Sequence, residues 1–570
     1  MTYLATQPQL LVETAATVAG IRSAIAEANA AAAGPTTGLV AAAADEVSAA
    51  AARLFGAYAQ QWHAVIGEAM AFHEKFVQAL AAAGSAYAAA EAANAAAVAS
   101  VLGGGPAIGA PLAATYDVAL IMSGSGTPIP SVEWMAGVLP YIAANSPVTG
   151  ASLPLDTPEG FYPVTGIKDL LANVSVARGV EVLDLALFGP QGLITAQGQS
   201  VGVLGYSQSS IISSLEMRHL AALGSPNTDK LSFTLLANPM NPNGGLLARF
   251  PGLSMPALGM EFYGATPSNT GYPLSSYTLQ YDGFADFPRY PLNVLSVLNA
   301  MAGIEFVHTA YAGLDPNNLP PGYNLVELPV SPTNNGLEHY YMITYPGLPL
   351  LHPLRAVPVL GNPLANLVEP NLTYLVNLGY GDPHYGYSTD YADVPTPFGL
   401  FPSINPITFA GDMLSGTQQG VNAFGRDLSA MAPTSPPSPS LPDLSQTGGL
   451  PIPWTLPSTP APTGLSLVSF IGALKAANTN IANTISDAAA TGYAVALPTA
   501  DIANSLLTSV PSYGVNLFLD GIAQAATGDP IGLVNAIGHP IAAGAALVTI
   551  AGGFEFLVLF NAAESIAQLG

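Results

Sequence analysis

Ser207 lies in a short segment whose residue types suit nucleophilic catalysis. The segment Gly205-Tyr206-Ser207-Gln208-Ser209 follows an apolar run at residues 200–204, typical of a buried strand, and precedes a helical pattern at residues 210–217. A sharp strand-to-helix turn presents such a serine above the sheet as a nucleophile, and Gly205 leaves room for that turn. Ser209 stands where a second glycine is usual, so an ordinary turn with a capping serine is the alternative interpretation.

A serine hydroxyl needs a base, usually histidine, and a carboxylate that orients the base. For a nucleophile at such a turn the chain order is serine, acid, histidine, so both partners should follow Ser207. Asp282, just after a predicted strand, is the first candidate for the acid, and Asp286 is the alternate. His308 is the first candidate for the base, and His339 is the alternate. The structural alternatives are turn or cap aspartates and packed, hydrogen-bonded histidines.

The same chemistry requires two hydrogen-bond donors for the oxyanion of the intermediate. The Gln208 N–H, at the start of the predicted helix, is one candidate, and the loop at residues 123–127 should supply the other. That loop matches neither the dinucleotide fingerprint nor the P-loop. No spacing typical of metal ligands occurs, so we expect neither a metal nor another cofactor.

The composition points to apolar partners. Only 8% of the 570 residues are charged, with 12 Lys and Arg against 36 Asp and Glu, for a net charge of −24. This balance argues against nucleic-acid binding, and the mean hydropathy of +0.40 suggests a protein groove, lipid or cell envelope as partner, including peripheral membrane association. The absence of cysteine excludes disulfides and thiolate metal sites.

The N-terminal region is alanine-rich and predicted to be helical. Apolar residues recur at spacings of three and four over residues 47–79, with a shorter stripe over residues 11–25, and residues 34–38 separate them. This pattern predicts an antiparallel helical hairpin whose stripes need a partner helix pair to complete a four-helix bundle. The first residues have neither the basic nor the apolar stretch of a secretory signal peptide.

After a glycine-rich linker, short predicted strands alternate with helices, which favours an α/β fold with a mostly parallel sheet. The predicted strands cover residues 118–122, 180–183, 201–204, 232–236, 277–280 and 339–344. Near the C-terminus, the apolar window 542–562 approaches the length of a membrane span, but Gly552, Gly553 and Glu555 interrupt it. We therefore expect this window to be a buried or interfacial helix.

Changes in composition divide the chain into six parts. They are a helical hairpin (1–95), a linker (96–114), an α/β core (115–355), an extension or lid (356–431), a Pro/Ser-rich linker (432–463) and an apolar helical region (464–570).

The N-terminal hairpin resembles the PE domain of the mycobacterial PE/PPE proteins. The resemblance is carried by residues 43–48, 72–80 and 87–91, although the family's Pro-Glu reads Pro8-Gln9 here. It implies a PPE-family partner for the hairpin, a secretion chaperone at the hairpin tip, and a type VII secretion signal at Tyr87 and Glu91. On physical grounds alone these two residues are an ordinary i,i+4 pair on a helix.

Residues 115–355 resemble the PE-PPE domain, a family of cutinase-like serine α/β-hydrolases. The shared motifs are the loop at residues 123–128, the tetrad at 205–208, Asn238-Pro239 with residues 241–245, and residues 281–288. The resemblance implies esterase or lipase chemistry on acyl esters, and it places a hydroxyl residue of the oxyanion hole at Ser125.

Two functional hypotheses follow. The first is a secreted or cell-envelope serine esterase or lipase, exported through its PE domain to the cell wall or outer surface, with an acyl ester or lipid substrate. The second is a non-catalytic surface or host-interaction protein that keeps the hydrolase fold as a scaffold.

Overall fold

The computed structural model describes residues 115–431 and 467–568, together with residues 29–38 and scattered positions up to residue 63. The chain divides into two compact units, Met1–Pro111 and Leu112–Gly570. In the first unit, residues 29–37 are helical, and His63 hydrogen-bonds both Asn29 (2.7 Å) and Thr36 (2.9 Å). These bonds belong to the region of the expected hairpin, most of which lies outside the described residues, as do Tyr87, Glu91 and the linker at 432–463.

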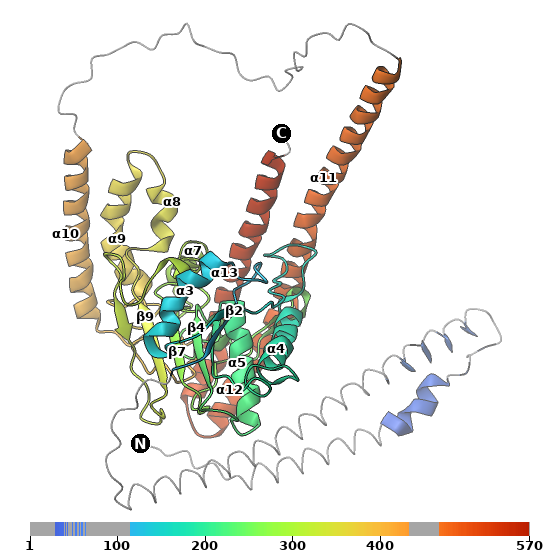
Figure 1. Ribbon diagram of the computed structural model, residues 1–570, viewed down its shortest axis with the longest axis horizontal. Helices are drawn as coiled ribbons and strands as arrows, with labels where there is room; N and C mark the ends of the chain where they lie inside the picture. Colours follow the sequence, from blue (N-terminus) through green and yellow to red (C-terminus); the bar gives the residue numbers. More distant parts are fainter. Residues whose placement is uncertain are drawn as a thin grey trace, which may run out of the picture. The chain divides into compact units, whose positions relative to one another are not determined.

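A seven-stranded, mostly parallel sheet forms the centre of the second unit, which confirms the predicted fold class (Figure 1). The strand order is β2-β1-β3-β4-β7-β9-β8, and β8 alone in this sheet runs antiparallel to its neighbour. The strands are β1 (Val118–Ile121), β2 (Ser152–Pro154), β3 (Val201–Tyr206), β4 (Leu231–Leu236), β7 (Leu274–Leu279), β8 (Leu325–Glu327) and β9 (Glu338–Ile343). A separate pair, β5 (Ser254–Met255) and β6 (Met260–Glu261), is antiparallel.

Helices cover both faces of the sheet, so the central strands β3, β4 and β7 are buried along almost their whole length. Successive strand residues point to opposite faces. Val118 and Leu120 pack with residues of α4 (Ala172–Phe188) and α5 (Gln208–Ala222). Ala119 and Ile121 pack instead with α3 (Val132–Asn145) and with the segment after α7 (Val294–Phe306).

One predicted strand was wrong. Residues 180–183 lie within α4, where Gly179, Leu183 and Leu187 are buried. The run Val180-Glu181-Val182-Leu183 alternates like a strand over four residues, but the longer helical spacing of its buried neighbours decides the structure.

Several short helices lie between or after the strands of the sheet, and two longer helices follow β9. They are α6 (Leu246–Arg249), η1 (Pro256–Leu258), η2 (Tyr311–Gly313), η3 (Pro349–Leu351), α8 (His352–Arg355), α9 (Gly361–Asn377) and α10 (Pro406–Met431). The long helix α10 packs along α9.

Three apolar helices form the C-terminal region: α11 (Leu467–Leu507), α12 (Ser509–Ala526) and α13 (Ile531–Gln568). They pack against one another, and α13 also packs on α7 of the sheet domain (Figure 1). One buried cluster contains residues from both parts, among them Phe250 and Phe287 of the domain and Leu547 and Ile550 of α13. The C-terminal helices therefore share a hydrophobic core with the sheet domain.

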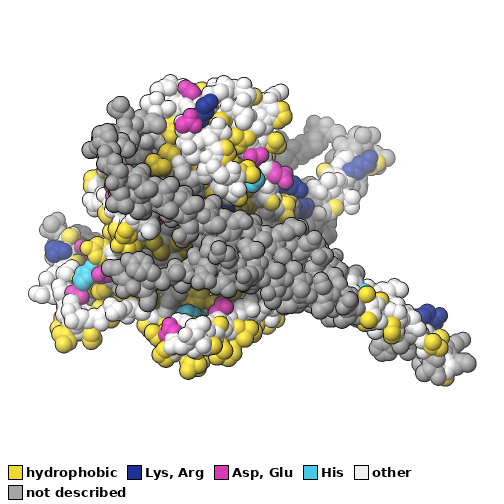
Figure 2. All heavy atoms as spheres, turned by 90° about the horizontal axis from the view of Figure 1, so that it is seen from below, with side chains coloured by type: hydrophobic (Ala, Val, Ile, Leu, Met, Phe, Trp, Pro, Cys, Tyr) yellow, Lys and Arg dark blue, Asp and Glu magenta, His cyan; other side chains and the backbone are white. Residues whose placement is uncertain are grey.

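The described surface carries few charges and several exposed apolar side chains. Figure 2 shows one face on which charged side chains are scattered among hydrophobic and uncharged ones. On α13, Val534, Ile537 and Ile541 are each more than half exposed. Among the described helices, the segment Ile531–Leu559 is long and apolar enough to cross a membrane, and a third of its most apolar window is buried. One such helix does not by itself indicate a membrane protein, because core helices have the same composition.

Candidate active site

Ser207 occupies the sharp turn between β3 and α5. Its backbone dihedrals are φ 55° and ψ −113°, a region that side-chain-bearing residues rarely adopt and that is found at functional sites. Gly205 permits the turn, because a Cβ there would lie 2.5 Å from the Ser209 carbonyl oxygen. The Gln208 N–H occupies the first position of α5, where the helix provides it with no acceptor.

Ser209 is part of the turn rather than a defect in the motif. Its side chain is fully buried, accepts a hydrogen bond from the Tyr206 N–H at 2.8 Å and donates one to the Tyr206 carbonyl at 3.0 Å. A glycine at this position could form neither bond. The hydroxyl thus ties the end of β3 to the first turn of α5.

The structure brings Ser207, His308 and Asp282 into one chain of hydrogen bonds. Ser207 Oγ lies 2.7 Å from His308 Nε2, and His308 Nδ1 lies 2.8 and 2.9 Å from the two oxygens of Asp282. Ser207 follows β3, Asp282 follows β7 and His308 follows α7. The three residues therefore come from separate elements and meet at the carboxyl ends of the parallel strands. All three side chains are buried or nearly so.

Two tyrosines that we did not predict hold this chain in place. The Tyr311 hydroxyl donates to Asp282 Oδ2 at 2.8 Å, and the Tyr206 hydroxyl donates to the His308 carbonyl oxygen at 2.7 Å. Burial, with the Asp282 charge nearby, raises the pKa of both phenols above the ordinary value, so both remain donors at neutral pH. Local sequence provides no signal for Tyr311, because its partner lies 29 residues away.

The structure does not bring the two alternates to the serine. Asp286 is buried beside the acid, but its Oδ2 accepts the Tyr281 N–H at 2.9 Å, and burial raises its pKa well above the ordinary value. His339, on β9, pairs with Glu327 at 2.9 Å and is about half exposed. Glu327 belongs to β8, the neighbour of β9 at the end of the sheet, so His339 lies away from Ser207.

The loop after β1 approaches the serine closely. A Cβ on Gly124 would lie 2.9 Å from Tyr206 Cδ1 and 3.0 Å from Ser207 Cβ, so any larger residue here would displace Tyr206 or Ser207. The Ser125 hydroxyl accepts a hydrogen bond from Gln208 Nε2 at 3.2 Å, and both residues line the same cavity as Ser207. The loop is fixed from outside by the Gly126 N–H, which donates to the Glu159 carbonyl oxygen at 2.7 Å.

The Gln208 side chain is fully engaged in positioning these loops. Its Nε2 also donates to the Gly160 carbonyl oxygen at 2.8 Å, and its Oε1 accepts from the Ser175 hydroxyl at 2.7 Å. The backbone N–H of Gln208 is therefore the part of this residue that could face a reacting oxygen.

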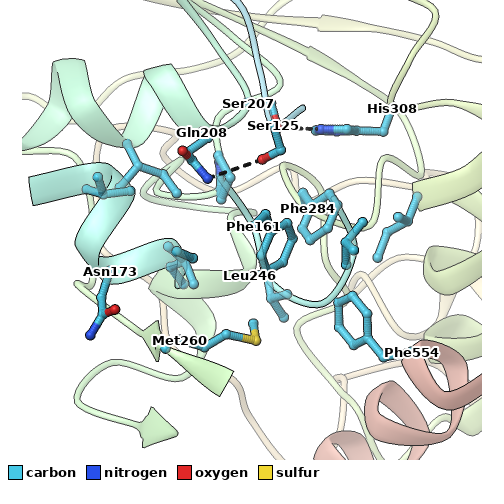
Figure 3. A pocket seen from close by; sticks show the side chains of 18 of the residues that line it. Ser125, Phe161, Asn173, Ser207, Gln208, Leu246, Met260, Phe284, His308 and Phe554 are labelled. Carbon is cyan, nitrogen blue, oxygen red and sulfur yellow. Dashed lines mark hydrogen bonds between the residues drawn. The ribbon is translucent and has the colours of Figure 1, made fainter. Parts of the chain in front are cut away.

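A cavity of about 340 Å³ extends from Ser207 and His308 (Figure 3). Its walls are mostly apolar and include Phe161, Leu246, Met260, Phe284 and Phe554. The size lies at the lower end of the range for small-molecule sites, ~300–1,000 Å³. Among the described residues, no group of three or more His, Asp or Glu side chains could hold a metal ion.

Comparisons with known proteins identify the family. The PE family model matches residues 4–94. PE3 of Mycobacterium tuberculosis is 43% identical over 443 residues, which cover 74% of this chain and 88% of PE3. The chain belongs to the PE family. In this PE protein the PE-PPE domain model matches residues 150–381. The matched segment begins after β1 and ends just beyond α9.

Other proteins match different shares of this chain. PPE28 of Mycobacterium tuberculosis is 50% identical over 81% of this chain and 68% of its own. The protein named esterase PE16 of the same organism is 45% identical over 71% of this chain and 74% of its own. A solved cutinase-like protein from Cryptococcus sp. is 18% identical, with a TM-score of 0.19 over 31% of this chain and 82% of its own.

Proposed function

We propose that this PE protein is a serine hydrolase that cleaves carboxylic esters, using Ser207 as nucleophile, His308 as base and Asp282 as acid. One observation carries the proposal: the hydrogen-bonded chain Ser207–His308–Asp282 stands at the end of an apolar cavity. The name of the relative esterase PE16 supports the same reaction class.

The geometry suits a two-step acyl transfer. Ser207 Oγ attacks the ester carbonyl while His308 Nε2 takes its proton, and the imidazolium then protonates the departing alcohol. Water, deprotonated by the same nitrogen, attacks the acyl-serine and releases the acid, which restores Ser207. Asp282 keeps the other proton on Nδ1 and stabilises the imidazolium.

The oxyanion of each intermediate would lie at the Gln208 N–H and the Ser125 hydroxyl. Both groups stand at the same wall of the cavity as Ser207. The start of α5 favours negative charge there. In this arrangement the Ser125 hydroxyl, which accepts from Gln208, is free to donate to the substrate oxygen.

Hydrolysis of p-nitrophenyl butyrate by the purified protein tests this function. Ser207→Ala and His308→Ala should each lower kcat/KM by roughly 10³-fold or more. His339→Ala is the matched control and should retain wild-type turnover. Turnover by Ser207→Ala equal to the wild type would refute the proposal, and absence of turnover by the wild type would favour the scaffold hypothesis.

We also propose export through the PE domain, to the cell wall or outer surface. Support comes from membership of the PE family and from the pair Tyr87 and Glu91, which lie outside the described residues. In this proposal a PPE-family partner covers the apolar stripe of the hairpin, and a secretion chaperone binds its tip.

A further inference from the structure

A row of aromatic rings connects the triad with the C-terminal helix α13. The Phe284 ring lies 4.8 Å from the His308 ring, the Phe161 ring lies 6.4 Å from Phe284, and the Phe554 ring lies 6.3 Å from Phe161, measured between centroids. Figure 3 shows the same progression, with Phe554 projecting from α13 at the end of the cavity away from Ser207. Phe554 thus lies on the wall of the same cavity as His308 and Phe161, from which it is separated by about 250 and 390 positions in the chain.

Among the described residues of α13, Phe554, Leu557 and Val558 line the cavity. Phe554 is 92% buried, whereas Leu557 and Val558 are part-exposed, and Leu557 packs against the same buried cluster as Phe554. None of the three can form a hydrogen bond through its side chain. A ligand that reaches them must present hydrocarbon.

The helix is held firmly in this position. A Cβ on Gly553 would lie 2.4 Å from Met301 Cε, so the backbone of α13 is in close contact with α7. Next to it, Glu555 Oε1 accepts a hydrogen bond from the Thr499 hydroxyl of α11 at 2.7 Å. These contacts fix α13 between a helix of the sheet domain and a helix of its own region.

The loop that carries Phe161 is attached at both ends of the cavity. On the triad side, the Gly160 carbonyl oxygen accepts from Gln208 Nε2 at 2.8 Å. On the other side, the Tyr162 hydroxyl donates to Asp501 of α11 at 2.6 Å. The C-terminal helices are therefore connected to the residues around Ser207 by hydrogen bonds as well as by ring contacts.

We propose that α13 forms the far wall of an acyl-chain site, with Leu557 and Phe554 setting the length of chain that the site accepts. The inference rests on the proposed ester hydrolysis and names its substrate class: esters of one medium-length, unbranched acyl chain. The carbonyl carbon lies at Ser207, and the chain passes Phe284 and Phe161 toward α13. A volume of about 340 Å³ suits one such chain.

The test compares variants on a ladder of p-nitrophenyl esters from butyryl to decanoyl. Leu557→Trp fills the far end of the cavity and should lower the decanoyl-to-butyryl ratio of kcat/KM by roughly 10-fold or more, since one methylene already changes discrimination by about 10-fold. Leu557→Ala opens the same end and should raise the ratio. Leu559→Trp, on an exposed position of α13, is the matched control and should leave the ratio unchanged.

A binding measurement separates this inference from the proposed function. Calorimetry with decanoate should show binding to the wild type and to Ser207→Ala, and at least 10-fold weaker binding to Leu557→Trp. Loss of decanoate binding in Leu557→Trp without ester turnover in any variant would support the acyl site and refute the esterase. Ester turnover with an unchanged chain-length ratio and unchanged decanoate affinity in Leu557→Trp would overturn the acyl site. Absence of both binding and turnover in the wild type would overturn both proposals.

Discussion

At the scale of single residues, Asp282 accepts hydrogen bonds from its own turn and from the segment after α7. Besides His308 and the Tyr311 hydroxyl, the Phe284 N–H donates to Asp282 Oδ1 at 3.0 Å. These bonds fix the carboxylate in the plane where it can hold one imidazole tautomer. Asp286, four residues later, has the same charge type but a different set of neighbours, so the two residues offer a matched pair.

The first prediction concerns this pair. Asp282→Asn should lower kcat for p-nitrophenyl butyrate by about 10³–10⁴-fold, because an amide cannot hold the required tautomer of His308. Asp286→Asn should change kcat by only a few-fold, because Asp286 pairs with the Tyr281 N–H, and an amide oxygen can still accept that bond. Steady-state kinetics would reject this assignment if Asp286→Asn caused the larger loss.

Local patterns led to Ser207 and Asp282 as first choices, and the chain order of serine, acid and histidine led to His308. A glycine before a serine between a strand and a helix, and an aspartate after a strand, are short-range signals. Tyr311 and Phe161 were missed because their roles depend on partners in other segments. Ser209 was read as a departure from the motif, since its two bonds to Tyr206 depend on the geometry of the folded turn.

At the scale of elements, the turn between β3 and α5 depends on one residue without a side chain. Gly205→Ala would place a Cβ 2.5 Å from a backbone oxygen of α5, so the turn must distort. We expect this variant to lose esterase activity and to unfold at lower temperature than the wild type. Gly202→Ala, on the same strand, is the control, because its Cβ would meet no atom nearer than 3.6 Å. Circular dichroism melts and ester hydrolysis measure both effects, and wild-type activity in Gly205→Ala would contradict the described turn.

A buried acid on α5 should make stability depend on pH. Burial, and then the charge of Asp184, raises the pKa of Glu216 to about 8, against about 4.3 for an unfolded chain. The folded protein therefore keeps a proton that the unfolded chain releases. The stability from this group is complete below about pH 4.3 and is lost as pH rises toward 8.

Glu216→Gln removes this titration and should reduce the fall in melting temperature between pH 5 and pH 8.5. Glu159, whose pKa burial also raises to about 8, still titrates in that variant, so the dependence becomes smaller without disappearing. The exposed Glu181→Gln is the control and should follow the wild-type curve. Identical curves for Glu216→Gln and the wild type would contradict the assignment of the slope to Glu216.

Five of the six predicted strands were found because they are short runs rich in aliphatic, β-branched and aromatic residues. The sixth, at residues 180–183, failed because four alternating residues cannot be distinguished from part of a helix. Strand order could not be predicted, since it depends on pairing between segments that are distant along the chain.

At the scale of the whole molecule, the C-terminal helices are part of the second unit rather than an appendage. Their shared core with the sheet domain includes Phe250 and Ile550, and α13 lines the cavity beside the triad. Composition predicted apolar helices after residue 464, but it contains no information about the surface on which they pack. That information lies in contacts between residues some 300 positions apart.

The export signal belongs to the same scale, because it concerns where the whole chain is delivered. Tyr87→Ala should leave the protein in the cytosol, because we propose that Tyr87 and Glu91 form the secretion signal, a Tyr-x-x-x-Asp/Glu pattern. Ser85→Ala is the control and should reach the envelope. Fractionation with an antibody against the hydrolase domain measures both variants. Wild-type levels of Tyr87→Ala in the envelope would contradict the proposal.

The central claim, that Ser207 is an activated nucleophile, is tested most directly by labelling with a fluorophosphonate. The serine oxygen would displace fluoride from phosphorus, and peptide mass spectrometry would locate the adduct. We expect one adduct, on the peptide that contains Ser207, absent from Ser207→Ala and greatly reduced in His308→Ala and Asp282→Asn. A folded wild-type protein that remains unlabelled, or that is labelled at another serine, would contradict this account.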